Sequence, residues 1–203
     1  MLVYQRKDTF YKRAKASGYR SRAAFKLQQL AQRAQLFRPG DRVIDLGAWP
    51  GSWLQVAVQA VGPAGRVIGV DRQPIDPLPE PNVIVLTGDV TDPLIQEKLV
   101  QACGGRADVV LSDLAPKLTG VRARDEAHAE ALADCVLGFT QGVLAPGGHL
   151  VVKLFTSSAS GPYLARLRAQ FDDVRTTRPE ATRKGSAEMY AIAKRFRGGR
   201  SQA

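Results

Sequence analysis

The stretch VIDLGAWPGSW, residues 43–53, decides how this 203-residue chain folds. Its first four residues form a short β-branched and aliphatic run of the kind that is typical of a buried strand. Glycine, proline and a second glycine follow at once, so the chain turns sharply where the strand ends. A strand that runs directly into such a turn predicts a ligand-binding loop at the carboxyl edge of an open α/β sheet.

Short apolar runs of the same kind recur at roughly helix-length intervals. They are Val67–Val70, Val83–Leu86, Val109–Leu111 and Leu150–Val152. Runs separated in this way indicate βαβ units and a parallel sheet. Two further runs, Asp173–Thr177 and Glu188–Ala193, lie close together and predict an antiparallel edge. The sequence therefore predicts one α/β domain over 1–203, with a doubly wound, mostly parallel seven-stranded sheet and an antiparallel edge strand.

Apolar residues at helical spacing also predict a helix before the first strand. Ser21 is a suitable N-cap, and the helix is expected to continue through about Phe37, because proline and glycine follow at positions 39 and 40.

The composition excludes several classes of protein. Cys103 and Cys135 form no CxxC pair and have no histidine at ligand spacing, so neither a disulfide framework nor a metal site is expected. The apolar stretches are far shorter than a membrane span, and the first residues are too charged for a signal peptide. We therefore expect a soluble protein of the cytoplasm with no membrane partner.

The formal net charge of +10 is unevenly distributed. Residues 1–38 contain ten Lys or Arg and one acid, and residues 175–203 contain eight against two, whereas the middle of the chain is acidic. Because polyanions bind largely through neutralisation of their phosphates, two basic ends suggest a nucleic-acid partner. Charge runs are also often solvated faces, and this alternative stays open.

Carboxylates lie at or just after the ends of four successive predicted strands, at Asp45, Asp71, Asp89 and Asp113. Since ligands bind at that edge, Asp71 is placed to accept hydrogen bonds from ribose hydroxyls, and Asp89 could bind an adenine amino group beside Trp53. Asp45 is expected to order the glycine loop or to meet an amine of the ligand. Each acid alone could instead be a turn or cap residue.

The glycine loop narrows the choice of ligand. It lacks the GxGxxG pattern of dinucleotide-binding proteins, and no GxxxxGK[ST] phosphate-binding loop occurs in the chain. The sequence therefore favours a nucleoside ligand without a pyrophosphate, and it disfavours NAD enzymes and P-loop NTPases.

Motifs in order along residues 11–195 resemble the FtsJ-like (RlmE-type) ribosomal RNA 2′-O-ribose methyltransferases. They read YKRAK (11–15), GYRSRAAFKL (18–27), DLG (45–47), PG (50–51), Trp53, SD (112–113), AP (115–116) and LAPGG (144–148). Each motif alone is modest evidence, whereas the ordered set is highly specific. The resemblance implies a single-domain, Rossmann-like S-adenosylmethionine-dependent methyltransferase fold.

The resemblance also implies the site. A catalytic Lys-Asp-Lys-Glu tetrad falls on Lys26, Asp113, Lys153 and Glu188. The residues carried over for binding S-adenosylmethionine are Gly51, Trp53, Asp71, Asp89 and Asp113. The implied reaction is in-line methyl transfer to a uridine 2′-hydroxyl of large-subunit ribosomal RNA, on an assembled or nearly assembled subunit. We expect a monomer with a basic RNA-contacting arm (1–24) and a disordered basic tail (196–203).

Three other functions stay open. They are a transfer RNA 2′-O-methyltransferase, a small-molecule methyltransferase with the same cofactor, and a non-catalytic RNA-binding ribosome assembly factor. The basic ends count against the second, and the complete tetrad counts against the third.

Four residues depart from the family pattern. Trp49 and Ser52 stand in GAWPGSW where relatives resemble GAAPGGW, so the shape of the cofactor pocket is expected to differ. Lys117 and Thr119 stand in SDLAPKLTG where the family tends to show asparagine and serine, which affects how the substrate is positioned.

Lys153 is the candidate group that handles the proton of the 2′-hydroxyl. A lysine must be neutral to accept a proton, and a neighbouring Lys26 cation favours the neutral form, whereas Asp113 and Glu188 favour the charged form. Lys153 could instead steer the hydroxyl by a hydrogen bond, with proton loss coming late. The sequence leaves this choice open.

Overall fold

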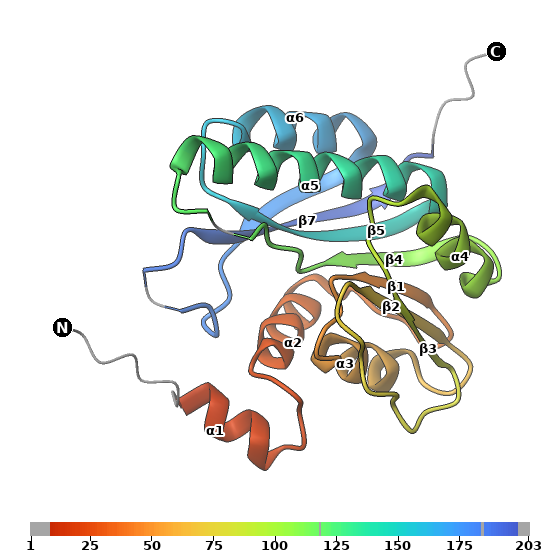
Figure 1. The fold of residues 1–203 in the computed structure, drawn as a ribbon. Helices are drawn as coiled ribbons and strands as arrows, with labels where there is room; N and C mark the ends of the chain where they lie inside the picture. Colours follow the sequence, from red (N-terminus) through yellow and green to blue (C-terminus); the bar gives the residue numbers. More distant parts are fainter. Residues whose placement is uncertain (1–8, 118, 184, 199–203) are drawn as a thin grey trace.

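The computed structural model describes residues 9–117, 119–183 and 185–198, which form a seven-stranded sheet in the order β3-β2-β1-β4-β5-β7-β6 (Figure 1). The strands are β1 (Arg42–Leu46), β2 (Arg66–Asp71), β3 (Val83–Thr87), β4 (Ala107–Ser112), β5 (Leu144–Phe155), β6 (Phe171–Thr177) and β7 (Glu188–Phe196). The helices are α1 (Thr9–Ala16), α2 (Ala23–Ala34), α3 (Ser52–Val61), α4 (Pro93–Cys103), α5 (Arg122–Val143) and α6 (Ser160–Gln170). The predicted α/β fold is confirmed.

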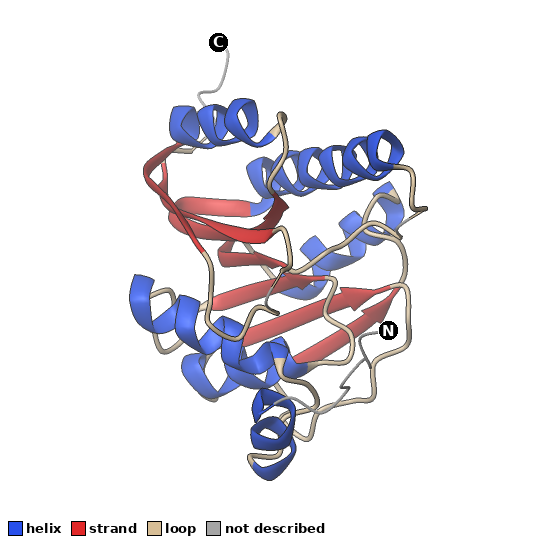
Figure 2. Ribbon diagram, turned by 90° about the vertical axis from the view of Figure 1, so that its left-hand side faces the viewer, coloured by secondary structure: helices blue, strands red, loops and turns tan. Residues whose placement is uncertain are grey.

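Helices cover both faces of the sheet, as Figure 2 shows. The apolar side chains of α4, α5 and α6 pack on one face with alternate strand residues such as Ile44 and Val110. Those of α2 and α3 pack on the other face with the intervening residues Val43 and Val109. Because successive side chains of a strand point to opposite faces, strands buried on both sides must be apolar throughout, which explains the continuous runs in the sequence.

The antiparallel part of the sheet is β7, which lies between β5 and β6 rather than at the outer edge. Strands β1 to β5 pair in parallel, and β6 and β7 form the antiparallel hairpin that the close spacing of the two last runs predicted. The register of β7 against β5 pairs Lys153 with Tyr190 and Phe155 with Glu188. This insertion brings the last strand beside the strand that carries Lys153.

Helix α2 differs in detail from its prediction. It begins at Ala23 with Arg22 as its N-cap, and it ends at Ala34 because Gln35 adopts a left-handed conformation with φ of 49°. Ser21 is therefore not the N-cap. Its hydroxyl accepts a hydrogen bond from the Ala23 backbone N–H at 3.2 Å and lies 2.7 Å from the Ser52 hydroxyl. The side chain thus joins the start of α2 to the start of α3.

The predicted amino-terminal arm and carboxyl-terminal tail are described only in part. Residues 1–8 and 199–203 lie outside the described residues. Residues 9–16 form α1, which packs on α2 through Phe10 and Ala14 against Phe25. The last described strand ends at Phe196, in contact with the Phe171 ring.

Candidate active site

A hollow of about 890 Å³ opens at the carboxyl ends of β1, β2, β3 and β4, where the connections from β1 and β4 diverge to opposite sides of the sheet. This is the position at which open α/β sheets bind ligands, and the volume is in the range of nucleoside-sized sites. Its lining includes residues at or just after the ends of these four strands and part of α5: Gly47, Trp49, Asp71, Arg72, Asp89, Asp113, Leu114, Lys117, Thr119, His128 and Leu132.

The glycine loop after β1 is held from outside by Arg20. The Arg20 guanidinium donates hydrogen bonds to the backbone carbonyls of Pro50 at 3.0 Å, Asp76 at 2.6 Å and Pro77 at 2.9 Å. Gly51 has a φ of +105°, and a Cβ there would come within 2.5 Å of the guanidinium. Only glycine therefore allows this approach. Arg20 lies in the quoted motif GYRSRAAFKL, but sequence reasoning assigned it no role.

Asp71 and Asp89 line the hollow and are already hydrogen-bonded. Asp71 accepts from the backbone N–H groups of Trp49 at 3.1 Å and Gln73 at 2.9 Å. Asp89 accepts from the Thr91 backbone and hydroxyl, and its other oxygen pairs with the Arg72 guanidinium. The Thr91 backbone hydrogen bond is the main cause that lowers the pKa of Asp89. The hydrogen bonds therefore fix the orientation of both side chains, and they favour the anionic form of Asp89.

Asp45 has a different environment from the other strand-end acids. It is fully buried, and within the described part of the chain neither carboxyl oxygen has a hydrogen-bond partner. Burial, followed by the charges of Asp113 and Asp71, raises the pKa of Asp45 well above its ordinary value. An unpaired buried acid is costly. Asp45 is not among the residues that line the hollow.

Gly51 and Trp53 are not among the residues that line the hollow. Trp53 is 3% exposed, donates its indole N–H to the Ala23 carbonyl at 2.8 Å and packs against the Tyr190 ring. The structure therefore places Trp53 behind the loop, between α2 and β7. Asp71, Asp89 and Asp113 are the three predicted cofactor residues that face the hollow.

The four tetrad residues come together in one chain of polar contacts. The Lys26 Nζ atom lies 2.9 Å from Glu188 Oε2, and the Lys153 Nζ atom lies 3.1 Å from Asp113 Oδ1. The lysine side chains are only 10% and 6% exposed. In such surroundings charge pairs are weakly screened and their geometry is well fixed.

Tyr190 joins the two ion pairs, and sequence reasoning missed it. Its hydroxyl accepts a hydrogen bond from Lys26 at 3.2 Å and donates one to Asp113 Oδ1 at 2.7 Å. Burial, together with the negative charge of Asp113, raises the pKa of Tyr190, so the hydroxyl keeps its proton and remains a donor. The sequence feature that could have identified Tyr190 is its position two residues after Glu188, because residues two apart in a strand point to the same face.

A family model described as FtsJ-like methyltransferase matches residues 19–196. The chain belongs to the FtsJ-like methyltransferase family. A relative in Methanoculleus marisnigri, named ribosomal RNA large subunit methyltransferase E, is 48% identical over 95% of this chain and 93% of its own length. A relative of the same name in Syntrophobacter fumaroxidans is 42% identical over 97% of this chain and 99% of its own length.

Solved structures of methyltransferases share the fold. A putative ribosomal RNA methyltransferase from Plasmodium falciparum superposes with a TM-score of 0.78 at 28% identity, over 89% of this chain and 100% of its own. Fibrillarin from Aeropyrum pernix, solved with natively bound S-adenosyl-L-methionine, has a TM-score of 0.58 at 17% identity, over 84% and 75%. The second likeness concerns the fold alone.

The departures from the FtsJ-like pattern have distinct structural settings. Ser52 is buried and contacts Ser21, so it supports the packing of α2 on α3. Lys117 and Thr119 line the hollow, and Thr119 donates from its backbone and hydroxyl to Asp125 Oδ1 at 2.7 and 2.8 Å. These contacts tie the loop after β4 to the start of α5. Trp49 lines the hollow with half of its surface exposed.

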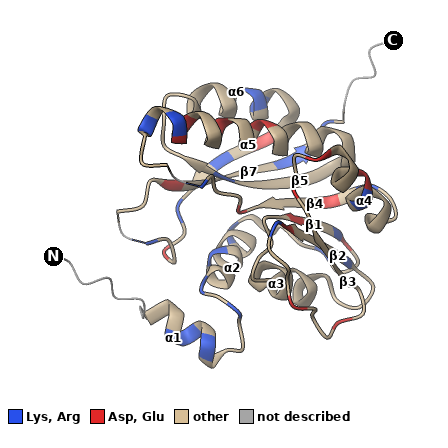
Figure 3. Ribbon diagram, in the orientation of Figure 1, with Lys and Arg blue, Asp and Glu red and all other residues tan. Residues whose placement is uncertain are grey.

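Two parts of the basic regions of this family member, α1 and the loop between β6 and β7, lie on one side of the molecule (Figure 1). Ala181, from the loop between β6 and β7, packs with Ala14 of α1 and Phe25 of α2. Exposed Lys12 and Lys15 lie on α1, which Figure 3 shows with its basic positions in blue.

Inside the described ranges, no helix has the length and apolar character of a membrane span.

Proposed function

We propose that this chain transfers the methyl group of S-adenosylmethionine to the 2′-hydroxyl of a uridine ribose in large-subunit ribosomal RNA. The observation that carries the proposal is the continuous contact path Glu188–Lys26–Tyr190–Asp113–Lys153, which meets the nucleoside-sized hollow at Asp113. The names of the relatives support ribosomal RNA as the substrate. We further propose that it acts in the cytoplasm as a monomer, on an assembled or nearly assembled subunit.

The residues around the hollow fit S-adenosylmethionine. Asp71 would accept the ribose hydroxyls, and Asp89 would accept the adenine amino group. Asp45 does not line the hollow, but its unpaired carboxyl is buried near Asp71 and Asp113 and would suit the ammonium group of the ligand. Asp89 already accepts four hydrogen bonds, so the adenine would share it with Arg72 or displace that side chain. The cofactor supplies an activated methyl group on a sulfonium, and no metal is needed for its transfer.

The protein then has mainly to position the acceptor ribose. The Lys153 Nζ atom donates a hydrogen bond to the Asp113 backbone carbonyl and lies 3.1 Å from the Asp113 carboxylate as an ion pair. These contacts fix the amine, and an N–H that they leave unused can bind the 2′-oxygen and aim it. We therefore favour the steering role for Lys153, with the proton leaving late. Asp113 orients Lys153, while Lys26, Glu188 and Tyr190 hold Asp113 in place.

The basic ends are proposed to contact the RNA. Residues 9–24 place Lys12 and Lys15 on an exposed helix, and Arg178 and Arg183 lie in the loop that packs near it. Phosphate contacts of this kind fix the orientation of an RNA without reading its sequence.

Tritium transfer from labelled S-adenosylmethionine tests the proposal, with naked ribosomal RNA, large subunits and transfer RNA as substrates. We expect label in a ribose of the large-subunit RNA, and we expect Lys153→Ala and Asp113→Ala to abolish it. Lys98→Ala, an exposed lysine on α4, is the matched control. Label only in transfer RNA would mean that transfer RNA, and not ribosomal RNA, is the substrate. Cofactor binding without label in any RNA would favour a small-molecule enzyme or a non-catalytic assembly factor.

A further inference from the structure

Trp49 is an exposed aromatic side chain placed inside a binding site. It is 51% exposed, and it lines the hollow together with Asp71 and Asp89. Among the described residues, the other large apolar side chains exposed to solvent are Tyr11, Leu94, Val100 and Val121, and none of them lines the hollow. Single exposed apolar residues are common on protein surfaces, but a half-exposed indole in a ligand-sized hollow offers a contact surface.

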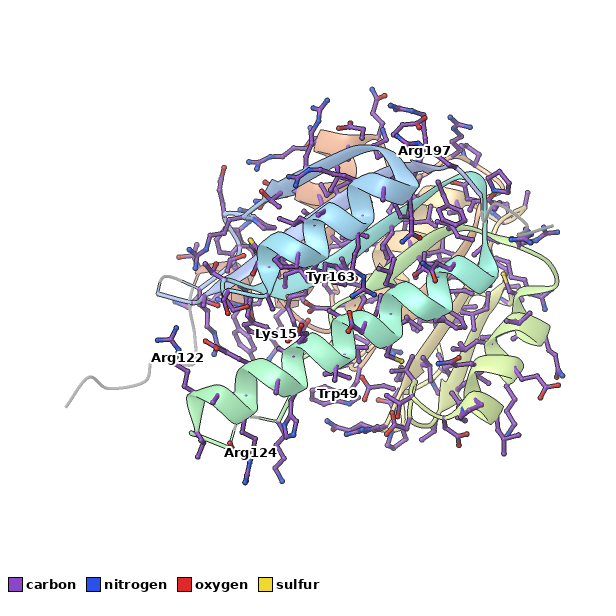
Figure 4. The ribbon with its side chains drawn as sticks, turned by 90° about the horizontal axis from the view of Figure 1, so that it is seen from above. Lys15, Trp49, Arg122, Arg124, Tyr163 and Arg197 are labelled. Carbon is purple, nitrogen blue, oxygen red and sulfur yellow. The ribbon has the colours of Figure 1, made fainter. Side chains whose placement is uncertain are left out.

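The backbone of Trp49 is fixed next to the predicted ribose acceptor. Its N–H donates to Asp71 Oδ2 at 3.1 Å, and the loop around it is held by the Arg20 contacts to Pro50. Trp49, which is labelled in Figure 4, lines the same hollow as His128 and Leu132 of α5. A ligand held by Asp71 therefore lies within reach of the indole.

Packing within the protein does not explain a tryptophan here. Half of the side chain is in contact with solvent, whereas Trp53, four residues later, is almost fully buried. An indole presents a flat π-surface that an alanine cannot provide, and nucleobases stack on such surfaces.

We infer that Trp49 stacks on the adenosine part of bound S-adenosylmethionine and strengthens cofactor binding in this chain. The inference rests on the proposed function, because it takes that cofactor as the ligand. An RNA base is the other possible stacking partner. The cofactor is favoured because Trp49 shares the hollow with both Asp71 and Asp89, whereas Lys153, on the acceptor side, is not among the residues that line it.

Intrinsic fluorescence provides a direct readout, because the chain contains only two tryptophans, Trp49 and Trp53. Trp53 is buried behind the loop and is expected to respond little to a ligand. The protein is titrated, without RNA, with S-adenosylhomocysteine and with adenosine. We expect both to quench the wild-type emission and to leave the remaining emission of Trp49→Phe almost unchanged.

Calorimetry with S-adenosylhomocysteine measures the energetic effect. We expect Trp49→Ala to raise the Kd about tenfold, as loss of one base–aromatic stack would, and Trp49→Phe to raise it much less. Leu94→Ala, which removes an exposed apolar side chain on α4, is the control and should not change the Kd. Thermal melting checks that the variants are folded.

Two results would overturn the inference. An unchanged Kd in Trp49→Ala, with no quenching in the wild type, would show that the indole does not touch the cofactor. A raised KM for RNA at unchanged Kd for S-adenosylhomocysteine would assign Trp49 to the RNA instead. The test is independent of methyl transfer: a Trp49-dependent Kd without label in any RNA would contradict the proposed function and still support this inference.

Discussion

The hollow and the tetrad are built in opposite ways, although they meet at Asp113. The hollow is made by the loops after the strands and by part of α5, and its acids Asp71 and Asp89 accept hydrogen bonds from backbone and side-chain groups of those loops. The tetrad is made by side chains from α2, the end of β4, β5 and β7 that are distant in sequence, and its two lysines are almost buried. An exposed ion pair contributes about 0–1 kcal/mol, whereas a buried polar group that loses its partner costs about 1–3 kcal/mol. Substitutions should therefore separate the two parts.

Replacement of Lys153 should have the largest effect. In Lys153→Met the aiming hydrogen bond to the 2′-oxygen is lost while the aliphatic stem is kept, so single-turnover methyl transfer should fall by about 10²- to 10⁴-fold. The Kd for S-adenosylhomocysteine should hardly change, because Lys153 does not line the hollow. A parallel loss of cofactor affinity would mean that the two parts of the site are not separable.

Tyr190→Phe should come next. The variant keeps the ring that packs on Trp53 and removes the hydroxyl between Lys26 and Asp113. We expect about tenfold slower methyl transfer, because Asp113 loses part of its orientation, and about 1–2 kcal/mol less stability in chemical denaturation.

Tyr163→Phe is the matched control for this substitution. Tyr163 is also buried, and its hydroxyl donates to the Ala133 carbonyl at 3.0 Å on the other face of the sheet. It should lose similar stability and keep its activity. Equal methyl-transfer activities in Tyr190→Phe and Tyr163→Phe would show that the Tyr190 hydroxyl has no role in the active site.

Asp45→Asn should change the pH dependence of stability. Because burial raises the pKa of Asp45 in the folded chain, the folded state holds a proton there that the unfolded state has released, so stability falls as pH rises from the ordinary value towards the raised one. The asparagine side chain does not titrate, so the variant does not lose stability in this way as the pH rises. It should be more stable than the wild type at about pH 7.5, by about 1–3 kcal/mol, with a smaller difference at about pH 4.5.

Cofactor binding gives the opposite readout for the same variant. If Asp45 meets the ammonium group of S-adenosylmethionine, calorimetry should show weaker binding to Asp45→Asn even though the protein is more stable. A variant that is less stable than the wild type at neutral pH would contradict the assignment of an unpaired buried acid.

Arg72→Gln should have the smallest effect. The Arg72 side chain is 70% exposed, and its pairing with Asp89 is open to solvent and salt. We expect a change of less than about 0.5 kcal/mol in the free energy of unfolding, and a change of less than about threefold in the Kd for S-adenosylhomocysteine. A large loss of affinity would show that Arg72 holds the cofactor itself.

The sequence by itself determined the fold class and the identity of the polar residues. The strands around Ile44, Ile68 and Val110 are local patterns. The resemblance to the FtsJ-like family, carried by the order of motifs, implied the tetrad Lys26, Asp113, Lys153 and Glu188, which the structure brings together. Such information is available in sequence because each strand, and each turn after it, depends mainly on residues close along the chain.

Only the tertiary structure decided how these residues meet. The position of β7 between β5 and β6 places the Tyr190 hydroxyl between Lys26 and Asp113, and it leaves Trp53 behind the loop instead of in the hollow. The same holds for the Arg20 contacts to the glycine loop. These contacts join residues far apart in the chain, so they depend on strand order, register and helix packing, which no local pattern specifies.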